Sequence, residues 1–438
     1  MKKLFFLLIL SVCCANLICA QDTVRHYWSN KKLMSQGLEQ NGVEVGNWVY
    51  FHKNGTKWME GGYLNGQKVG LWKVWYDDGK KSQEYYADNG TFKSWYPSGK
   101  IESEGQMQNG QKTGQWTFYY PNGALFKKTT YERDSVHGKV VEYHDNGKVK
   151  FEGNYVYGRL NGYSTWWNAS GEKDMEGNTI DDLQDGIWKF YLPNGTMGST
   201  GLFQKGKQEG KWTYYYDNGN VWKYVNYQDG KREGETKAWY ENGQLQRMGT
   251  FKNDKETGKW KSFYRNGQLQ DYGFFSEGKM EALWTGYYEN GVQKYETAYE
   301  NNMRTGSHRY WNENGKLKTE GNYLRDLKHG NWKDFADNGK ILESGKYQLD
   351  KKEGKWTFYN EYAVKVREQN FVNDAPDGKF TEFYPNGKKH FSGSFKNRQK
   401  NGPWMSWDIN GNLVYKVVFT NGHKKVVKDM NTKMNKPF

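Results

Sequence analysis

The chain has little cysteine, little proline and few aliphatic residues for its 438 residues. Its three cysteines, Cys13, Cys14 and Cys19, all lie in the first twenty residues. Without that segment the chain has no disulfide, thiolate metal ligand or thiol nucleophile. Hydrophobic residues make up only 35% of the chain, although 17% of it is aromatic. Such a chain cannot fill one large aliphatic core, but it can bury many small aromatic clusters.

Long hydrophobic runs are also absent, except at the start of the chain. Lys2 and Lys3 precede an apolar run from Leu4 to Leu10, and Ala20 is a small residue at a cleavage point. This layout predicts a signal peptide at residues 1–20, although cleavage after Ala15 is an alternative. We therefore expect an exported protein that is periplasmic, displayed on the outer surface or secreted. Because no other stretch reaches about 18 consecutive apolar residues, we expect no transmembrane segment.

An excess of negative charge is missing as well, since the formal net charge is +14. The basic residues are interspersed with acids, apart from the lysine-rich end after Gly422. We interpret them mainly as solvated turns and edges. The alternative is attraction to an anionic partner such as an acidic glycan, lipid headgroups or an acidic protein.

What the chain does contain is a repeated phrase of 24 residues, exemplified by "GKWTYYYDNGNVWKYVNYQDGKRE" from Gly210. Numbering each phrase from its first residue gives sixteen units, of which only the one from Gly70 is short, at 20 residues. The first residues of the units are Gly46, Gly70, Gly90, Gly114, Gly138, Gly162, Gly186, Gly210, Gly234, Gly258, Ala282, Gly306, Gly330, Gly354, Gly378 and Gly402. The array thus covers residues 46–425, with a degenerate cap unit at 21–45 and a basic tail at 426–438, as atypical ends flank other repeat proteins.

Each unit is predicted to be a β-hairpin. Position 10 is Gly in every unit except the one with Ala363, and Asn usually precedes it, as in Asn218-Gly219. Asn-Gly between two aromatic-rich runs indicates a tight primed turn, in which both residues adopt a positive φ. We expect strands at about positions 2 to 7 and 11 to 18. The fold class that follows is all-β: an elongated, single-layer, solenoid-like ribbon of about sixteen hairpins.

Aromatic residues recur at fixed positions, which indicates a structural role. Position 6 is aromatic in all sixteen units, and position 3 is Trp in ten. The predicted repeat core includes Trp116, Tyr119, Trp188, Tyr191, Trp212, Tyr215, Trp239, Trp260, Phe263, Trp356 and Tyr359. Strict alternation puts positions 3 and 6 on opposite faces of a strand. Either the strand is bulged or both faces carry aromatic rings.

The unit resembles the MORN repeat variant, and more specifically the bacterial YwqK-type arrays. The resemblance rests on "GxWxxYYxNG", a frequent Glu at position 15 such as Glu176 and Glu320, and a following aromatic residue and "xxGxxxG". It implies β-hairpin sheets that act as non-enzymatic scaffolds contacting proteins or membrane lipids, and an antitoxin-like role for YwqK-type members. The export signal and the length depart from an intracellular antitoxin. The aromatic hairpins also look like choline- and glucan-binding repeats, whose units are generally nearer 20 residues.

Motifs for catalysis or cofactor binding are not evident. The eight histidines occupy unrelated positions, no Gly-x-Ser-x-Gly elbow occurs, and Gly-Lys pairs such as Gly258-Lys259 lack the rest of a phosphate loop. We therefore expect no enzyme, no metal site and no cofactor.

A binding site is more plausible where the units vary. Position 7 is Tyr in four successive units, at Tyr216, Tyr240, Tyr264 and Tyr288, but differs in others. We hypothesise that this ladder is a binding stripe for a peptide or a sugar chain, since Tyr offers a flat apolar face and a polar tip. The alternative is that the rings pack against neighbouring turns.

The most favoured function is an exported, non-enzymatic scaffold for a protein partner, in which many similar units give a long docking face. The second is a cell-envelope carbohydrate binder that uses aromatic platforms, and the third is contact with an anionic membrane surface. Nucleic acid is disfavoured because the chain is predicted to be exported and lacks a clustered basic stripe.

Overall fold

The computed structural model describes residues 22–425, which form 38 β-strands in one open antiparallel sheet and no helix. The predicted signal peptide at 1–20 and basic tail at 426–438 lie outside these residues. Within the described residues nothing provides a helix that could cross a membrane. The expected fold class, an all-β ribbon of repeated hairpins, is confirmed.

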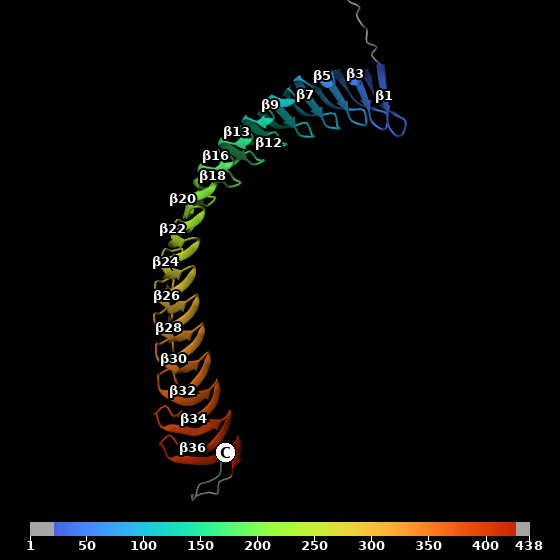
Figure 1. Ribbon diagram of the computed structural model, residues 1–438. Helices are drawn as coiled ribbons and strands as arrows, with labels where there is room; N and C mark the ends of the chain where they lie inside the picture. Colours follow the sequence, from blue (N-terminus) through green and yellow to red (C-terminus); the bar gives the residue numbers. More distant parts are fainter. Residues whose placement is uncertain (1–21, 426–438) are drawn as a thin grey trace, which may run out of the picture. The chain divides into compact units, whose positions relative to one another are not determined.

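The chain divides into two compact units, and the boundary between them falls within strand β19 (Met197–Gln204). The strands of the first unit are β1 (Asp22–Tyr27), β2 (Leu33–Gln40), β3 (Val43–Phe51), β4 (Lys57–Leu64), β5 (Gln67–Trp75), β6 (Lys81–Tyr86), β7 (Asn89–Trp95), β8 (Ile101–Gln108), β9 (Gln111–Tyr119), β10 (Leu125–Glu132), β11 (Ser135–Val136), β12 (Gly138–Tyr143), β13 (Val149–Val156), β14 (Arg159–Leu160), β15 (Gly162–Trp167), β16 (Lys173–Ile180), β17 (Leu183–Gln184) and β18 (Gly186–Tyr191). Figure 1 draws these strands in blue to green and labels some of them.

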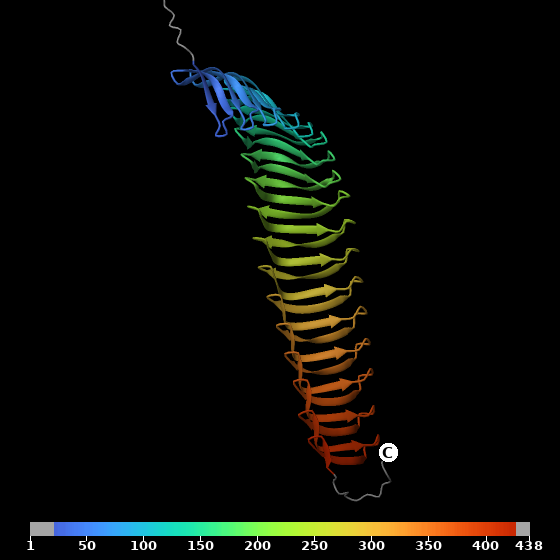
Figure 2. The ribbon, with the colours of Figure 1, turned by 90° about the vertical axis from the view of Figure 1, so that its right-hand side faces the viewer.

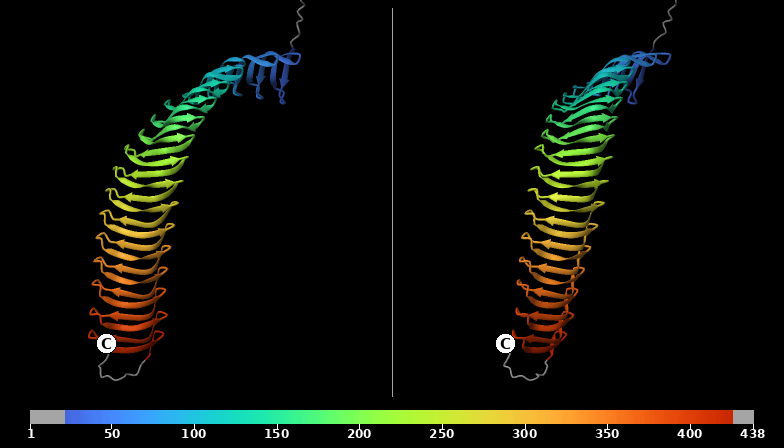
Figure 3. Two further views of the ribbon diagram at one scale, coloured as in Figure 1. Left: turned by 60° about the vertical axis from the view of Figure 1, so that its left-hand side comes forward. Right: turned by 90° about the vertical axis from the view of Figure 1, so that its left-hand side faces the viewer.

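The strands of the second unit are β20 (Lys207–Tyr215), β21 (Val221–Gln228), β22 (Lys231–Trp239), β23 (Leu245–Lys252), β24 (Lys255–Phe263), β25 (Leu269–Ser276), β26 (Lys279–Tyr287), β27 (Gln293–Glu300), β28 (Met303–Trp311), β29 (Leu317–Leu324), β30 (Leu327–Phe335), β31 (Ile341–Gln348), β32 (Lys351–Tyr359), β33 (Lys365–Val372), β34 (Ala375–Phe383), β35 (Lys389–Lys396), β36 (Gln399–Trp407), β37 (Leu413–Thr420) and β38 (His423–Lys425). In Figure 2 these hairpins stack one on the next, with their turns aligned along two edges, and Figure 3 shows a single layer of strands.

The turn at the Asn-Gly pair differs from our expectation. In the hairpin of β20 and β21, Tyr216 N donates to Asn220 O at 2.8 Å and Gly219 N donates to Tyr216 O at 2.9 Å. Of the pair, Gly219 has a positive φ of 84° but Asn218 does not. This geometry is a three-residue loop in which a type I turn is followed by a left-handed Gly, rather than a two-residue primed turn. Asn is favoured at the position of Asn218 because its side-chain oxygen accepts a hydrogen bond from Asn220 N.

The two-residue primed turn occurs at the other end of the hairpins. Gln228 pairs with Lys231, and the two residues between them, Asp229 and Gly230, have φ values of 51° and 81°. Two consecutive positive φ angles are the mark of the primed turn. The first strand of most repeats therefore starts before position 1, as β20 does at Lys207, and the predicted strand boundaries were wrong by several residues at this end. In three units the strand begins at position 1, as β12 does at Gly138.

One face of the sheet carries the buried tryptophans at position 3, and we call it the tryptophan face. Gly210 pairs with Tyr227 and Trp212 with Val225, so positions 1, 3, 16 and 18 point to the same side. Trp212 contacts Tyr227 edge-on at a centroid distance of 6.4 Å. The five tryptophans of the predicted core at position 3 are all at most 3% exposed: Trp116, Trp188, Trp212, Trp260 and Trp356.

Each buried Trp is packed against a Gly of the preceding hairpin. The Cβ of any other residue at Gly345 would lie 2.2 Å from the ring of Trp356, and Trp356 Nε1 donates to Lys346 O at 3.0 Å. Lys352 covers the same ring with its ammonium nitrogen 3.9 Å from the ring centroid. A single layer of strands can thus bury a large ring, because the neighbouring strand has room beneath it and a lysine stem lies above it.

The predicted cap at 21–45 forms a hairpin of the same kind. Gly37 lies beneath Trp48, and Trp28 Nε1 donates to Phe51 O at 3.1 Å. The segment departs from the repeat at its loop, where Lys31 takes the positive φ of 63° that Gly has at position 10 of nearly all units.

Candidate binding face

The opposite face of the sheet carries the side chains of positions 2, 4, 6 and 15, and we call it the glutamate face. Glu176 at position 15 pairs across the strands with Lys189 at position 4, and Tyr191 at position 6 donates to Glu176 Oε1 at 2.6 Å. Position 6 is therefore on the side away from the tryptophans. Both faces therefore carry aromatic residues, and the strand pairing also shifts register between positions 5 and 6, as it does between Tyr214 and Tyr215.

Each Glu at position 15 is held in an ion pair with a basic residue of the same face. The partner comes from position 12, 2 or 4, so the contact recurs although the sequence position of the base changes. These pairs are Glu60 with Lys57, Glu84 with Lys81, Glu104 with Lys93, Glu152 with Lys139, Glu176 with Lys173 and Lys189, Glu296 with Arg309, Glu320 with Lys333, and Glu368 with Lys355 and Lys365.

Glu176 is the most enclosed of these carboxylates, at 5% exposed. Burial by itself would raise its pKa, but the bonds from Lys173 and Tyr191 lower the pKa to about 2. The carboxylate is thus ionised and saturated by donors, which suits a structural role better than proton transfer. The same contacts raise the pKa of Tyr191, after the larger effect of its burial.

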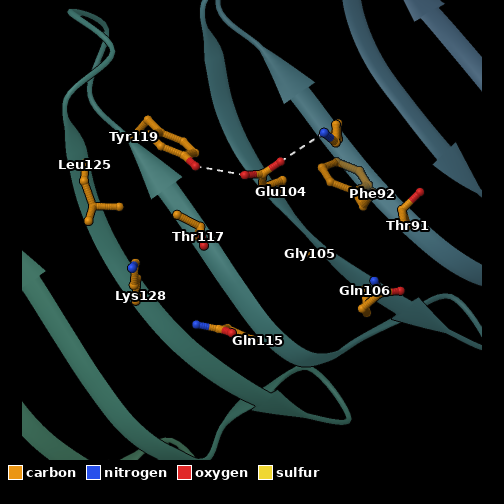
Figure 4. Close-up of a pocket in the computed structure, with 11 residues that line it drawn as sticks. Thr91, Phe92, Glu104, Gly105, Gln106, Gln115, Thr117, Tyr119, Leu125 and Lys128 are labelled. Atoms are coloured by element: carbon orange, nitrogen blue, oxygen red, sulfur yellow. Dashed lines mark hydrogen bonds and ion pairs between the residues drawn. The ribbon is translucent and has the colours of Figure 1, made fainter.

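The glutamate face is hollowed between hairpins. An open hollow of about 490 Å³ surrounds Glu104, where Tyr119 donates to Glu104 Oε1 at 2.8 Å and Lys93 lies 3.1 Å from Oε2 (Figure 4). Its lining includes the amides of Gln106 and Gln115. Such a surface offers hydrogen-bond donors and acceptors, and the Tyr119 bond is the first cause that holds the pKa of Glu104 low.

The four tyrosines of the predicted binding stripe each link their hairpin to the next one. Their hydroxyls donate to the carbonyl of the position-6 residue in the following hairpin, and the rings are half-buried. The bonds are Tyr216 to Trp239 O at 2.8 Å, Tyr240 to Phe263 O at 2.9 Å, Tyr264 to Tyr287 O at 2.8 Å and Tyr288 to Trp311 O at 2.8 Å. These contacts give the ladder a structural role, and partner binding by it stays a prediction.

In two units position 7 is His, which makes the same inter-hairpin contact. His52 Nε2 lies 3.0 Å from Trp75 O, and His144 Nε2 lies 2.9 Å from Trp167 O. These two histidines replace tyrosines of the inter-hairpin contact. The predicted core also included six residues at position 6. They lie on the glutamate face, opposite the tryptophans of position 3, and are half-buried: Tyr119, Tyr191, Tyr215, Trp239, Phe263 and Tyr359.

Sequence reasoning missed an exposed apolar patch in the first unit. Its members lie at the tight-turn ends of β13 to β18 and are 44% to 65% exposed: Val156, Tyr157, Tyr163, Ile180, Leu183 and Ile187. Ile180 pairs with Leu183 across the turn, and Asp182 N donates to Leu160 O of the preceding turn at 3.0 Å. The usable signal was Tyr163 and Ile187 at position 2, where most units have a polar residue.

Groups for metal chemistry do not converge in the part of the chain that the structure describes. Residues 22–425 contain no cluster of three or more His, Cys, Asp or Glu that could hold a metal ion. The described surface carries ion-paired glutamates, open hollows and an apolar patch.

These features define a class of protein, a single-sheet β-hairpin repeat protein. The family profile described as "MORN repeat variant" matches nine segments, at residues 88–109, 112–133, 136–157, 208–229, 232–253, 256–277, 304–324, 328–348 and 376–397. Each match begins two residues before position 1 of a unit, so the predicted register is the register of the family. The nine matched segments are therefore similar to MORN-variant repeats, which are generally associated with contacts to proteins or membrane lipids.

No match was found among curated proteins. Solved structures with some similarity include "Crystal Structure of TcdB2-TccC3-Cdc42", TcdB2-TccC3 without its hypervariable C-terminal region, and the Tc holotoxin pore of Photorhabdus luminescens. Each is 11% identical and matches 91% of this chain, with a TM-score of 0.15. The chain spans 22%, 22% and 26% of those chains, respectively. At that TM-score the likeness carries no conclusion about fold or function.

Proposed function

We propose that this protein is an exported, non-enzymatic scaffold that docks a protein partner on the apolar patch of residues 156–187. The observation that carries the proposal is the patch itself, since six large apolar side chains lie exposed in or near neighbouring tight turns. Contiguous apolar surface of this kind marks protein interaction sites. The MORN-variant repeats support a contact function, and the ionic saturation of the glutamates argues against acid–base chemistry.

The surroundings of the patch indicate the chemistry of the partner. Asp181, Asp182 and Asp185 lie in or beside the turns that carry Ile180 and Leu183. Asp181 and Asp182 are exposed and Asp185 is half-buried. Their carboxylates also accept bonds from neighbouring turns, as Asp182 Oδ1 does from Leu160 N at 2.7 Å. An apolar centre with an acidic rim suits a protein surface that has apolar side chains ringed by Lys or Arg. A toxin-neutralising role, as implied by the YwqK resemblance, would be one case of such docking.

The test compares two pairs of substitutions at equivalent positions. Ile180→Lys with Leu183→Lys changes the patch, and Leu324→Lys with Leu327→Lys changes the same cross-strand pair in another hairpin. Full-length protein of each kind is expressed in the native organism, crosslinked and recovered. We expect one defined protein to be recovered with the wild type and the control pair, but at least tenfold less with the patch pair. Equal recovery of every protein with both pairs would refute docking at the patch.

Export is tested separately by cell fractionation and by sequencing the N-terminus of the mature chain. A chain that begins at Gln21 and lies outside the cytoplasm is expected. An uncleaved cytoplasmic chain would remove export from the proposal and leave the docking surface to the experiment above.

A further inference from the structure

The glutamate face changes character in three consecutive hairpins of the second unit. Position 15 is Glu in the hairpins that contain Glu296, Glu320 and Glu368, each in an ion pair. In the hairpins that begin at Gly210, Gly234 and Gly258 it is Tyr224, Met248 and Tyr272. The acidic partner of the face is thus replaced by a large apolar side chain three times in succession.

The lysines of the glutamate face are retained in these hairpins, although the glutamates at position 15 are replaced. Tyr224 pairs with Lys237 and Met248 pairs with Lys261, at the positions where Glu320 pairs with Lys333 and forms an ion pair with it. Among the ion pairs of the described residues, none involves Lys237 or Lys261.

Position 2 adds two more ammonium groups to the same face. Lys211 and Lys259 lie over aromatic rings, with the ammonium nitrogens 4.3 Å from the centroid of Tyr224 and 4.7 Å from that of Tyr272. At positions 2, 4, 6, 15 and 17 of these three hairpins, Glu235 is the single acidic residue, and it is exposed. The face is therefore strongly basic here, while it is charge-balanced in the hairpins with Glu at position 15.

A hollow of about 580 Å³ opens in this basic region. Tyr224 and Trp239 line it with ring centroids 5.5 Å apart and an angle of 49° between the rings, so they form an aromatic corner. Thr213, Asn220 and Asn242 add hydroxyl and amide groups to the lining, and Lys211 adds its ammonium group. The volume lies within the usual range for ligand pockets, and flat apolar rings flanked by a few polar groups suit a sugar ring.

The spacing of the charges selects between a glycan and a peptide. Lys237 and Lys261 occupy the same position in successive hairpins, and two strands per hairpin set a repeat of about 10 Å. A disaccharide in an extended polysaccharide has about this length, so one acid group per disaccharide would meet one lysine per hairpin. An extended acidic peptide presents side chains on one face every 6.8 Å or so, which does not match the lysines.

We propose that the hairpins of residues 210–287 bind an anionic polysaccharide that carries one acidic group per disaccharide. A sugar ring packs in the corner of Tyr224 and Trp239. The acidic groups contact Lys211, Lys237 and Lys261. This site lies in the second unit and is independent of the apolar patch of the first.

Hyaluronan, with one carboxylate in each disaccharide, is the probe, and its dissociation constant is measured by the fluorescence of the full-length protein. Tyr224→Glu with Met248→Glu and Tyr272→Glu restores the glutamates that other hairpins carry, and Ser344→Glu is the matched control outside the site. We expect at least tenfold weaker binding for the triple variant and no change for the control. Equal affinity of the triple variant and the wild type would overturn the site.

Two further probes test the chemistry of the ligand. Polyglutamate and a neutral oligomer of N-acetylglucosamine should each bind at least tenfold more weakly than hyaluronan. Polyglutamate binding as tightly would show that the site recognises charge alone, and equal binding of the neutral oligomer would remove the role of the lysines. Either result would overturn the proposal.

Variants that keep the aromatic rings guard against misfolding of the triple variant. Lys237→Gln with Lys261→Gln should weaken hyaluronan binding several-fold with an unchanged unfolding temperature, and unchanged binding would contradict the proposal. Ile180→Lys with Leu183→Lys should leave hyaluronan binding intact, so this site and the protein-docking patch can fail separately.

Discussion

Two hairpin contacts on the tryptophan face solve the same packing problem in different ways. Beneath Trp356 lies Gly345, and the ring is fully buried, with Tyr347 edge-on at a centroid distance of 4.9 Å. At the equivalent positions one finds His308 and Thr297, joined by a bond of 2.8 Å between Thr297 Oγ1 and His308 Nδ1. The first contact is apolar and has no space left, whereas the second is polar, with Thr297 buried and His308 half-buried.

The comparison shows that Trp at position 3 and the Gly eleven residues before it occur together. In all ten hairpins with Trp at position 3, the residue eleven positions earlier is Gly. In the other six it is Gly only once, at Gly153, which precedes Ser164. The reason is steric, because a Cβ at these glycines would lie within the indole ring. The Gly is therefore needed for close approach and not for a positive φ.

The largest effect is expected from Gly345→Ala. The added methyl group would overlap the ring of Trp356, and we expect a loss of about 2 to 3 kcal/mol in local stability. Hydrogen exchange of β31 and β32 measures it, since a repeat array need not unfold as one unit. Thr297→Ala is the control, for which the loss of one hydrogen bond predicts about 1 kcal/mol. Unchanged exchange in Gly345→Ala would contradict the steric explanation.

A smaller effect follows from the protonation of His308. Burial, together with the charges of Arg304 and Lys328, lowers its pKa to about 4. The unfolded chain takes up the proton near pH 6.5, so the stabilising effect is complete above that pH and is lost as the pH falls toward 4. For a half-buried ring we expect about 1 to 2 kcal/mol. Hydrogen exchange of β28 at pH 7 and pH 4.5 measures it.

The matched control replaces the contact of Thr297 and His308 by a contact of Gly and Trp. Thr297→Gly with His308→Trp recreates the Gly and Trp pair, which has no titrating group, so the pH dependence of β28 should disappear. If the dependence persists, another group is responsible.

The next effect concerns the first residue of the repeat. Ala282 has a positive φ of 58°, where Gly258 has 66° and open space around its Cα. An L-residue other than Gly pays about 1 kcal/mol for this conformation. Ala282→Gly should therefore stabilise β26 by about 1 kcal/mol, and Gly258→Ala should destabilise β24 by a similar amount. Thermal unfolding and hydrogen exchange check both, and opposite signs would refute the explanation.

The smallest effect is expected from Tyr240→Phe with Tyr264→Phe. Each change removes a hydroxyl bond to a neighbouring carbonyl that water can partly replace, so we expect up to about 1 kcal/mol per site. Loss of partner binding with unchanged unfolding would instead support the predicted binding stripe. Tyr120→Phe, which removes the same bond in another hairpin, is the control.

Some features were predictable because they are local. The 24-residue register, the hairpins and the need for Gly at position 10 follow from turn chemistry within a few residues, and Gly219 has the positive φ that this requires. The boundary of β20 was not predictable in this way. The Asn-Gly pair is the typical sequence of a two-residue turn, but the two-residue turn is formed at Asp229 and Gly230. Both turns contain Gly and polar residues, so composition alone does not rank them.

The amino-acid sequence by itself determined that the protein repeats a hairpin with aromatic residues at positions 3 and 6. Only the tertiary structure decided that Trp212 and Tyr215 lie on opposite faces, that Tyr240 bonds the next hairpin, and that Lys237 has lost its acidic partner. These properties depend on atoms that are ten or more residues apart in sequence and meet only when neighbouring strands pair. Local periodicity describes one strand, whereas burial and charge balance belong to the contacts between strands.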